Sequence, residues 1–314
     1  MAHQEEKCPY VVGNTIKLRL GAPYNQQEIT AKITRVFEPF TLSCAMVVLL
    51  VHPALGLTGH LVLKLFDRRF AAQLRKDHKL NPWTPEIERQ YHDFILDGSA
   101  SEFITRLNTD SKIAEEEGDT WNDPQNEAYL HDHMQDLYGT EVEAYQTLKD
   151  IQGKNIPQLF ACLTAPSSSL SQKPSVNKYI DVSGVLLQYI DGFLLTDIAA
   201  HAPREVWQSV CDEAIQIVNR IGDRGILNED VKTRNFIVQE NPGRKFKVFM
   251  IDFALCNFRS EYEDETDWWK WKAIQDEEGA VGYVMQKYLH GGFVYRRSAR
   301  YKQLDWEFKR ADVY

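Results

Sequence analysis

The chain has 314 residues, a formal net charge of −9 and a pI near 5.5, with 26% charged and 43% hydrophobic residues. This composition is typical of an ordinary globular protein, large enough for one two-lobed catalytic unit or for two small domains. The acidic balance without a basic stripe argues against nucleic acid as a partner, and the lack of an 18-residue apolar run argues against a membrane span.

The cysteines and the first residues predict an intracellular, cytoplasmic protein. The cysteines are five, an odd number, and they are widely spaced: Cys8, Cys44, Cys162, Cys211 and Cys256. Most lie in apolar segments, so we expect reduced thiols and no disulfide framework. Residues 1–7 lack the apolar core of a secretory signal.

The N-terminal part is predicted to form a polar lead-in and then a hairpin. Residues 1–28 are the lead-in, with one short strand at 15–20, and apolar strands follow at 29–37 and 44–50. The turn at 38–43 contains no glycine, and its Pro39 removes a backbone amide. Glu38 adds a negative charge there, so this turn is poorly suited to bring backbone amides to a phosphate.

Residues 59–67 form an apolar strand that contains one lysine, Lys64, next to Leu63 and Leu65. Burying an ammonium group is costly unless an anionic partner is present. We therefore expect Lys64 to pair with a carboxylate; the alternative is a lysine on an edge strand that reaches out to water.

A charged insertion and a helix follow this strand. Residues 68–138 are predicted as a helical and loop insertion, in which Ile87, Tyr91, Phe94 and Ile95 have the spacing of one helix face.

The next segment, 139–148, has Val142, Tyr145 and Leu148 at helical spacing. Thr140 is predicted as its N-cap. Glu141 and Glu143 are the two carboxylates on this helix that could pair with Lys64.

Two further strands are expected before the C-terminal half. Residues 151–162 are a loop and a strand, and residues 185–192 are a buried strand that runs into a polar connector ending at Gly192. The simplest interpretation of the second segment is a core strand and turn.

The densest group of polar residues between apolar runs lies at 225–253. Asp230, Lys232 and Asn235 form the pattern Asp-x-Lys-x-x-Asn ahead of one apolar strand, and a second strand ends at Asp252-Phe253. Two carboxylates and an amide offer the hard oxygen ligands that magnesium prefers. A surface hairpin with acidic turn residues is the alternative.

Taken in order, these segments over roughly residues 29–260 resemble the protein-kinase-like superfamily. The segments 63–67, 234–236 and 251–254 are most similar to divergent kinase-like proteins of filamentous fungi. The resemblance implies an α+β, two-lobed fold, with a small antiparallel β lobe and one key helix at 29–192, hinge included, and a mainly helical lobe at 193–314. It also implies ATP and magnesium as cofactors.

By this resemblance, four residues carry the chemistry of phosphoryl transfer. Asp230 orients or deprotonates the acceptor hydroxyl, and Lys232 neutralises charge on the transferred phosphoryl group. Asn235 and Asp252 bind magnesium.

The resemblance also assigns the residues that hold the nucleotide. Lys64, held by Glu141, contacts the inner phosphates. In the hinge, Leu187 gates the adenine pocket, and the Gln188 carbonyl and the Ile190 amide face the nucleotide.

Several departures from the kinase pattern keep alternative functions open. The glycine-rich loop is missing, Asn228-Glu229 replaces the usual His-Arg, and Ala254 replaces a glycine. No Ala-Pro-Glu follows, so we expect no control by activation-loop phosphorylation.

Lys232 favours a protein Ser/Thr kinase as the first interpretation. The short chain after Asp252 favours a small-metabolite kinase, and the missing loop favours a pseudokinase that serves as a binding module. Catalysis ranks above the pseudokinase because all the charged and amide positions are present. The expected partners are a nucleotide and a protein or small-molecule acceptor.

Overall fold

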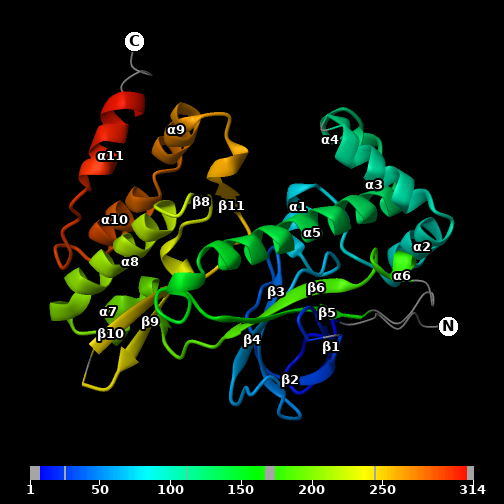
Figure 1. The fold of residues 1–314 in the computed structure, drawn as a ribbon, viewed down its shortest axis with the longest axis horizontal. Helices are drawn as coiled ribbons and strands as arrows, with labels where there is room; N and C mark the ends of the chain where they lie inside the picture. The colour runs from blue at the N-terminus through cyan, green and yellow to red at the C-terminus, as the bar shows by residue number, and fades with distance from the viewer. Residues whose placement is uncertain (1–7, 25, 111, 167–173, 244, 310–314) are drawn as a thin grey trace. The chain divides into compact units, whose positions relative to one another are not determined.

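The computed structural model describes residues 8–24, 26–110, 112–166, 174–243 and 245–309 (Figure 1). The lead-in residues 1–7 therefore lie outside the described part. Contacts divide the chain into two compact units. Unit 1 comprises residues 1–138 and 159–189, and unit 2 comprises residues 139–158 and 190–314.

Unit 1 contains an antiparallel sheet of strands and a set of helices. Its strands are β1 (Thr15–Leu20), β2 (Glu28–Val36), β3 (Cys44–Leu50), β4 (Leu61–Leu65), β5 (Leu159–Ala165) and β6 (Val182–Gln188). Its helices are α1 (Ala72–Asp77), α2 (Pro85–Leu96), α3 (Ser99–Thr109), α4 (Ile113–Glu117), α6 (Pro174–Asn177) and the first part of α5 (Asp123–Thr147). The strands predicted at 15–20 and 44–50 are confirmed.

The six strands close into a barrel in the order β1-β2-β3-β4-β6-β5. Closure depends on a short contact between β1 and β5, where Arg19 pairs with Thr164 and Leu20 with Leu163. The small antiparallel sheet predicted from the sequence is present, but its closure was not expected, because nothing local in β1 indicates that it pairs with a strand so far along the chain.

Alternating residues of the strands fill the interior of the barrel with apolar side chains. Leu61, Leu63 and Leu65 of β4 are buried in one core cluster with side chains from the other five strands. Gly184 of β6 permits a close approach to β4, because a Cβ at this position would lie 2.6 Å from the Leu65 side chain and 2.7 Å from the carbonyl oxygen of Lys64.

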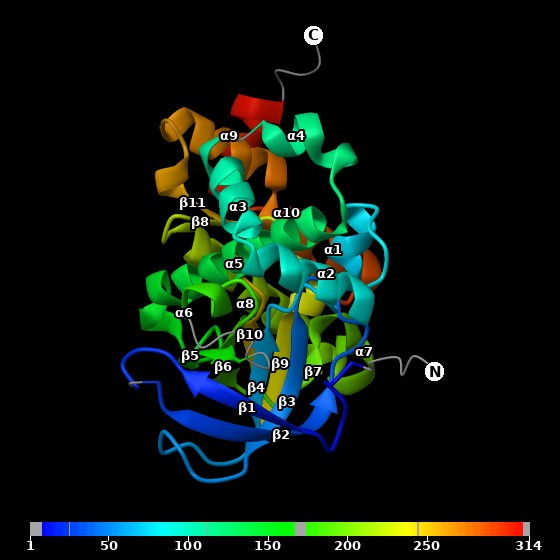
Figure 2. The same cartoon turned by 90° about the vertical axis from the view of Figure 1, so that its right-hand side faces the viewer.

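The insertion at 68–138 is helical, and its helices share a second apolar cluster. Tyr91 and Ile95 of α2, Phe103 of α3 and Ala128 of α5 are buried in it. The predicted helical face of α2 is thus confirmed. These helices lie along the first half of α5, on the far side of unit 1 from β1 and β2 (Figures 1 and 2).

Helix α5 is a single helix of 25 residues that begins at Asp123, so the predicted N-cap role of Thr140 is wrong. Buried side chains recur along the helix on both sides of this position, among them Met134, Leu137 and Ala144. A glycine in a helix interior costs only about 1 kcal/mol, and this burial outweighs the local signals of Gly139 and Thr140 for a helix boundary.

Unit 2 contains short strands and most of the remaining helices. Its strands are β7 (Phe193–Leu194), β8 (Ile226–Asn228), β9 (Phe236–Asn241), β10 (Lys245–Met250) and β11 (Cys256–Phe258). Its helices are α7 (Ile198–His201), α8 (Trp207–Gly222), α9 (Glu265–Gln275), α10 (Glu277–Tyr288) and α11 (Ala299–Leu304), followed by a π-helical turn (Asp305–Lys309). One buried face of α8 contacts β10 and α10.

The two units together give a mixed fold with a β-rich N-terminal region and a helical C-terminal region, which is compatible with two lobes. The cysteines of the described residues are free thiols, and three of them are buried. No helix in the described ranges has the apolar stretch that a bilayer crossing requires, and this includes α5, the longest of them.

Candidate functional site

Unit 2 holds the segment in which the sequence places the catalytic residues. The predicted hairpin is confirmed: β9 and β10 pair antiparallel, with Phe236 opposite Met250. Asn235 precedes β9 and Ile251 follows β10, and the amide of Ile251 donates to the carbonyl of Asn235 at 2.8 Å. The pairing therefore brings Asn235 and the segment of Asp252 to the same end of the hairpin.

Asp230 lies at the centre of a small hydrogen-bonded group. The buried Asn235 donates its Nδ2 to the carbonyl oxygen of Asp230 at 2.8 Å and to its Oδ2 at 3.0 Å. Lys232 forms an ion pair with Oδ1 of the same carboxylate. Asp230 is 20% exposed and Lys232 is 50% exposed, so the group is anchored at Asn235 and reaches solvent at Lys232.

Asn228 joins the Asp230 loop to the Asp252 segment. Its Oδ1 accepts a hydrogen bond from the backbone amide of Asp230 at 2.8 Å, and its Nδ2 donates to the carbonyl oxygen of Asp252 at 3.0 Å. The side chain is 1% exposed. Because one buried amide uses both its donor and its acceptor, the two segments keep a fixed distance from each other.

A buried ion pair holds the backbone of Asn228. Glu277, the first residue of α10, accepts the backbone amide of Asn228 at 2.8 Å through Oε1 and pairs with Lys272 through Oε2. Lys272 also donates to the carbonyl oxygen of Ile226 at 3.4 Å. Lys272 and Glu277 are 3% and 1% exposed. We call Asn228, Lys272 and Glu277 the Asn228 network.

Asp252 has an unusual backbone conformation. Its φ of 72° lies in the left-handed region, which costs a non-glycine residue roughly 1–3 kcal/mol and is tolerated best by Asn and Asp. The next amide, of Phe253, donates to Oε2 of the fully buried Glu141 at 3.4 Å. Such strain is typical of residues whose side chain must point in a particular direction.

Tyr145 of α5 packs against this segment, with its ring centroid 5.4 Å from that of Phe253. Burial, and then the nearby Glu141 and Asp252 carboxylates, raise the pKa of Tyr145 well above its ordinary value. Its phenol therefore stays neutral.

Three predicted site residues, Lys64, Leu187 and Gln188, belong to unit 1, and the others belong to unit 2. Lys64 lies in β4, opposite Ala45 of β3 and Val185 of β6, and is 7% exposed. It is therefore in the middle of the sheet and is not a lysine on an edge strand. Its Nζ lies 5.3 Å from the centroid of the Phe66 ring.

The predicted hinge residues lie at the end of β6. Leu187 pairs with Val62 of β4 and is 6% exposed, and Gln188 is the last residue of the strand. Ile190 is buried and is the first residue that the contacts assign to unit 2 on this side of the chain. Their expected contacts with a nucleotide stay predictions.

The donor set of the loop fits a magnesium ion bound with a phosphate group. Nδ2 of Asn235 is turned to Asp230, while its Oδ1 makes no hydrogen bond within the described residues. No group of three or more His, Cys, Asp or Glu side chains in these residues could hold a metal by itself. Magnesium usually binds through one or two carboxylates with substrate phosphates, so Asn235 and Asp252 match a nucleotide-linked ion better than an independent metal centre.

Two supporting residues were missed by the sequence analysis. Asn228 was noted only as a departure from His-Arg-Asp, although its place two residues before Asp230 could have indicated its bridging role. Glu277 gives no local signal, because it acts on a strand that lies 49 positions earlier in the chain.

A comparison with curated proteins finds a partial match. No protein-family model matches the chain. Over 112 residues it is 28% identical to the KEOPS complex subunit Bud32 of Pyrococcus abyssi. The match covers 32% of this chain and 49% of that relative, so the chain spans about half the length of the curated relative it matches.

Proposed function

We propose that the protein is an ATP- and magnesium-dependent phosphotransferase of the protein-kinase-like class, acting on Ser/Thr hydroxyls of proteins. The observation that carries this proposal is the hydrogen-bonded group of Asp230, Lys232 and Asn235, linked through Asn228 to Asp252. The likeness to Bud32, an atypical protein-kinase-like protein, gives coarse support.

The chain's own residues would act by positioning and by neutralising charge. Magnesium-bound ATP supplies the phosphoryl group. Asp230, held by Asn235, takes the proton of the acceptor hydroxyl, and Lys232 stabilises negative charge on the phosphoryl oxygens. Asn235 and Asp252 would hold the metal ion.

Lys64 would contact the inner phosphates, with Glu141 as its partner. Glu141 is fully buried, whereas the alternative carboxylate Glu143 is exposed. A buried ammonium and a buried carboxylate each require an opposite charge, which supports the choice of Glu141.

Nucleotide binding is tested by thermal unfolding of the full chain with ATP, with and without magnesium. Ligand at 100 times its Kd should stabilise the folded protein by about 2.7 kcal/mol. The substitution Asp252→Asn should remove the magnesium-dependent part, because Asn accepts the left-handed backbone but has no charge.

The matched control is Asp276→Asn, a second Asp of unit 2 with positive φ, 45°, that lies outside the proposed metal site. It should retain the magnesium-dependent shift. An equal shift in parent and Asp252→Asn would contradict the proposed metal site, and no response of the parent to ATP would contradict the proposed function.

A pseudokinase is the second candidate, because the turn between β2 and β3 contains Glu38 and Pro39 where phosphate-binding turns carry glycines. Binding of ATP without transfer to any protein or metabolite would support it. Lys232→Ala separates the acceptor classes: we expect loss of transfer to protein, and full activity in this variant would favour a small-metabolite kinase.

A further inference from the structure

A buried hydroxyl group in unit 2 stands out because nothing in the fold uses it. Tyr145 lies in the second half of α5 and is fully buried. Its hydroxyl oxygen makes no hydrogen bond within the described ranges. A buried polar group without a partner is costly, and a phenylalanine would fill nearly the same space without this cost. The hydroxyl is therefore a candidate for a role that the fold alone does not require.

The ring of Tyr145 is held in one position. It meets the ring of Phe253 edge to face, with 5.4 Å between the centroids and 83° between the planes. Phe253 is also fully buried, and its backbone amide donates to Oε2 of Glu141 at 3.4 Å. The second half of α5 and the segment after β10 are thus joined at two points. The direction of the Tyr145 hydroxyl is fixed by the same packing.

Two carboxylates lie near this hydroxyl, those of Glu141 and Asp252. Burial, and after it the negative charges of these two residues, raise the pKa of Tyr145 well above its ordinary value. The neutral phenol can donate a hydrogen bond to a carboxylate. All three residues belong to unit 2.

Of the two carboxylates, Asp252 is the better acceptor for a hydrogen bond that forms with a ligand. Glu141 precedes Tyr145 by one turn of the same helix, so their spacing is set whenever α5 forms, and yet the hydroxyl does not donate to it. Asp252 is only partly buried and lies between β10 and β11 with a φ of 72°. A strained residue outside helices and strands changes its side-chain direction more readily than one within a helix.

A donor beside Asp252 has a clear chemical use. Carboxylates that bind a metal ion are commonly held by hydrogen bonds from neighbouring groups, and loss of such a partner typically weakens metal binding by about 10–100-fold. A neutral hydroxyl suits this task, because it orients the carboxylate without adding a positive charge that would repel magnesium.

We propose that Tyr145 is a positioning residue for Asp252, and that its hydroxyl donates to the Asp252 carboxylate when magnesium and nucleotide bind. The inference rests on the proposed phosphotransferase function, in which Asp252 is a metal ligand. In the free chain the hydroxyl lowers stability, and the bond formed with the ligand recovers this loss.

The first test is Tyr145→Phe, which keeps the ring and its contact with Phe253. The Kd for Mg-ATP, measured by calorimetry on the full chain, should rise about tenfold. The Kd for ATP in the presence of EDTA should stay within twofold of the parent, because Asp252 acts through the metal. An unchanged Kd for Mg-ATP, or an equal loss with and without magnesium, would overturn the inference.

A double variant tests whether Asp252 is the acceptor. Once Asp252→Asn has removed the charged metal ligand, the further change Tyr145→Phe should alter the Kd for Mg-ATP by less than twofold. A second tenfold loss in the double variant would mean that the hydroxyl serves another group, such as Glu141, and would contradict the role proposed for Tyr145.

The nucleotide-free chain gives a readout that does not depend on binding. The urea midpoint of Tyr145→Phe should equal or exceed that of the parent, because the substitution removes a hydroxyl without a partner. The matched control is Tyr91→Phe, since Tyr91 is equally buried but donates to the carbonyl of Tyr179 at 2.9 Å. Its midpoint should fall, while its Kd for Mg-ATP stays within twofold of the parent.

The outcomes separate this inference from the function on which it rests. A lower midpoint of Tyr145→Phe, or failure of this variant to fold, would show that the hydroxyl already has a partner in the free chain, and the inference would be wrong. If the parent does not bind Mg-ATP, the proposed function fails and the inference fails with it. If the parent and Tyr145→Phe bind Mg-ATP equally well, the inference alone fails.

Discussion

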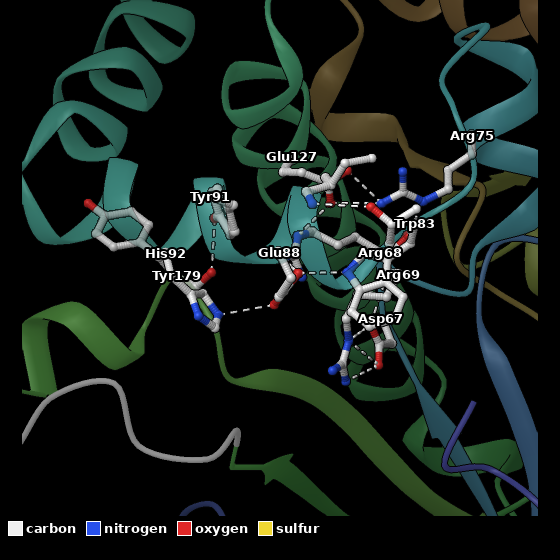
Figure 3. Close-up of polar contacts among 12 residues, drawn as sticks. Asp67, Arg68, Arg69, Arg75, Trp83, Glu88, Tyr91, His92, Glu127 and Tyr179 are labelled. Atoms are coloured by element: carbon white, nitrogen blue, oxygen red, sulfur yellow. Dashed lines mark hydrogen bonds and ion pairs between the residues drawn. The ribbon is translucent and has the colours of Figure 1, made fainter. Parts of the chain in front are cut away.

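The Asn228 network buries charges, and so does the arginine–glutamate cluster, which comprises Arg68, Arg75, Glu88 and Glu127 (Figure 3). The two groups differ in what lies at their edge. In the cluster, each carboxylate is enclosed, and the most exposed of them, Glu88, is 12% exposed. In the network, the buried pair Lys272–Glu277 holds Asn228, and beyond it the charges become accessible. The cluster thus fixes one structural element to another, whereas the network supports groups that are open to a ligand.

The groups that the network supports have unusual features. Asp230 and Lys232 are 20% and 50% exposed, and Asp252 keeps a left-handed backbone. A strained backbone is costly for the fold and is tolerated where the side chain serves a ligand. The comparison therefore predicts that substitutions in and around the network can change turnover and the free energy of unfolding separately. Substitutions in the cluster should change both together.

The largest effect is expected for Asp230→Asn. Asn keeps an oxygen that can accept from Asn235, so the loop should fold, but it cannot take a proton. Turnover should fall by about 10²–10⁴-fold, while the Kd for nucleotide stays within a few-fold, since the lost interaction is made in the transition state. Steady-state kinetics and equilibrium binding measure the two quantities, and a parallel loss of both would place Asp230 in nucleotide binding.

The next largest effect is expected on the free energy of unfolding, for a substitution of Glu277. Glu277→Ala leaves Lys272 buried without its carboxylate and the amide of Asn228 without its acceptor, so we expect a loss of about 3–5 kcal/mol in the free energy of unfolding. Urea unfolding measures this loss. Glu265→Ala, which removes the exposed partner of Arg259, is the control and should unfold like the parent.

A double variant separates the contribution of the network to stability from its contribution to turnover. Lys272→Met with Glu277→Met replaces the ion pair by apolar side chains and should recover most of the stability. It should not recover turnover, because Asn228 still lacks the acceptor that holds its backbone. Recovery of both would mean that the network serves the fold alone.

Local patterns account for the parts of this molecule that the sequence predicted correctly. The strand at 44–50 and the hairpin of β9 and β10 follow from apolar runs bounded by polar turns. The group of Asp230, Lys232 and Asn235 could be predicted because its residues are neighbours in the chain. In a tight loop, the spacing of these residues along the sequence determines how far apart they lie in space.

The parts that were missed depend on contacts between distant residues. Closure of the barrel needs Leu20 to meet Leu163, and the support of Asn228 comes from Glu277. The start of α5 was misplaced because Thr140 resembles an N-cap locally, and buried side chains on both sides of it override this signal. The hydrophobic periodicity of a single segment does not indicate which distant segment it will contact.

His131 provides a pH test of the arginine–glutamate cluster. Its Nε2 donates to the carbonyl of Lys178 at 2.9 Å, and burial, followed by the charge of Arg68, lowers its pKa from 6.5 to about 4, although Asp67 and Glu88 oppose this. As pH falls below 6.5, the unfolded chain therefore binds the proton first. Stability contributed by neutral His131 is complete above pH 6.5 and falls by about 3 kcal/mol by pH 4, since one pKa unit corresponds to about 1.36 kcal/mol.

The variant His131→Gln keeps a donor for the Lys178 carbonyl and cannot be protonated. Its unfolding free energy should fall less steeply than that of the parent between pH 6.5 and pH 4. Urea unfolding at several pH values measures the difference between the two curves. Parallel curves would show that His131 is protonated as easily in the folded protein as in the unfolded chain.

The smallest effect in free energy is expected for the proposed pairing of Lys64 with Glu141. Glu141→Gln keeps an oxygen for the amide of Phe253 and removes the charge, so the loss of stability should be about 1–3 kcal/mol. Lys64→Met should cost a similar amount. If the two side chains pair, the double variant is less destabilised than the sum of the single ones, and the cycle gives a coupling energy of about 0.5–3 kcal/mol. A coupling near zero would mean that each charge has another partner, and the assignment of Lys64 to the phosphates would then have to stand without Glu141.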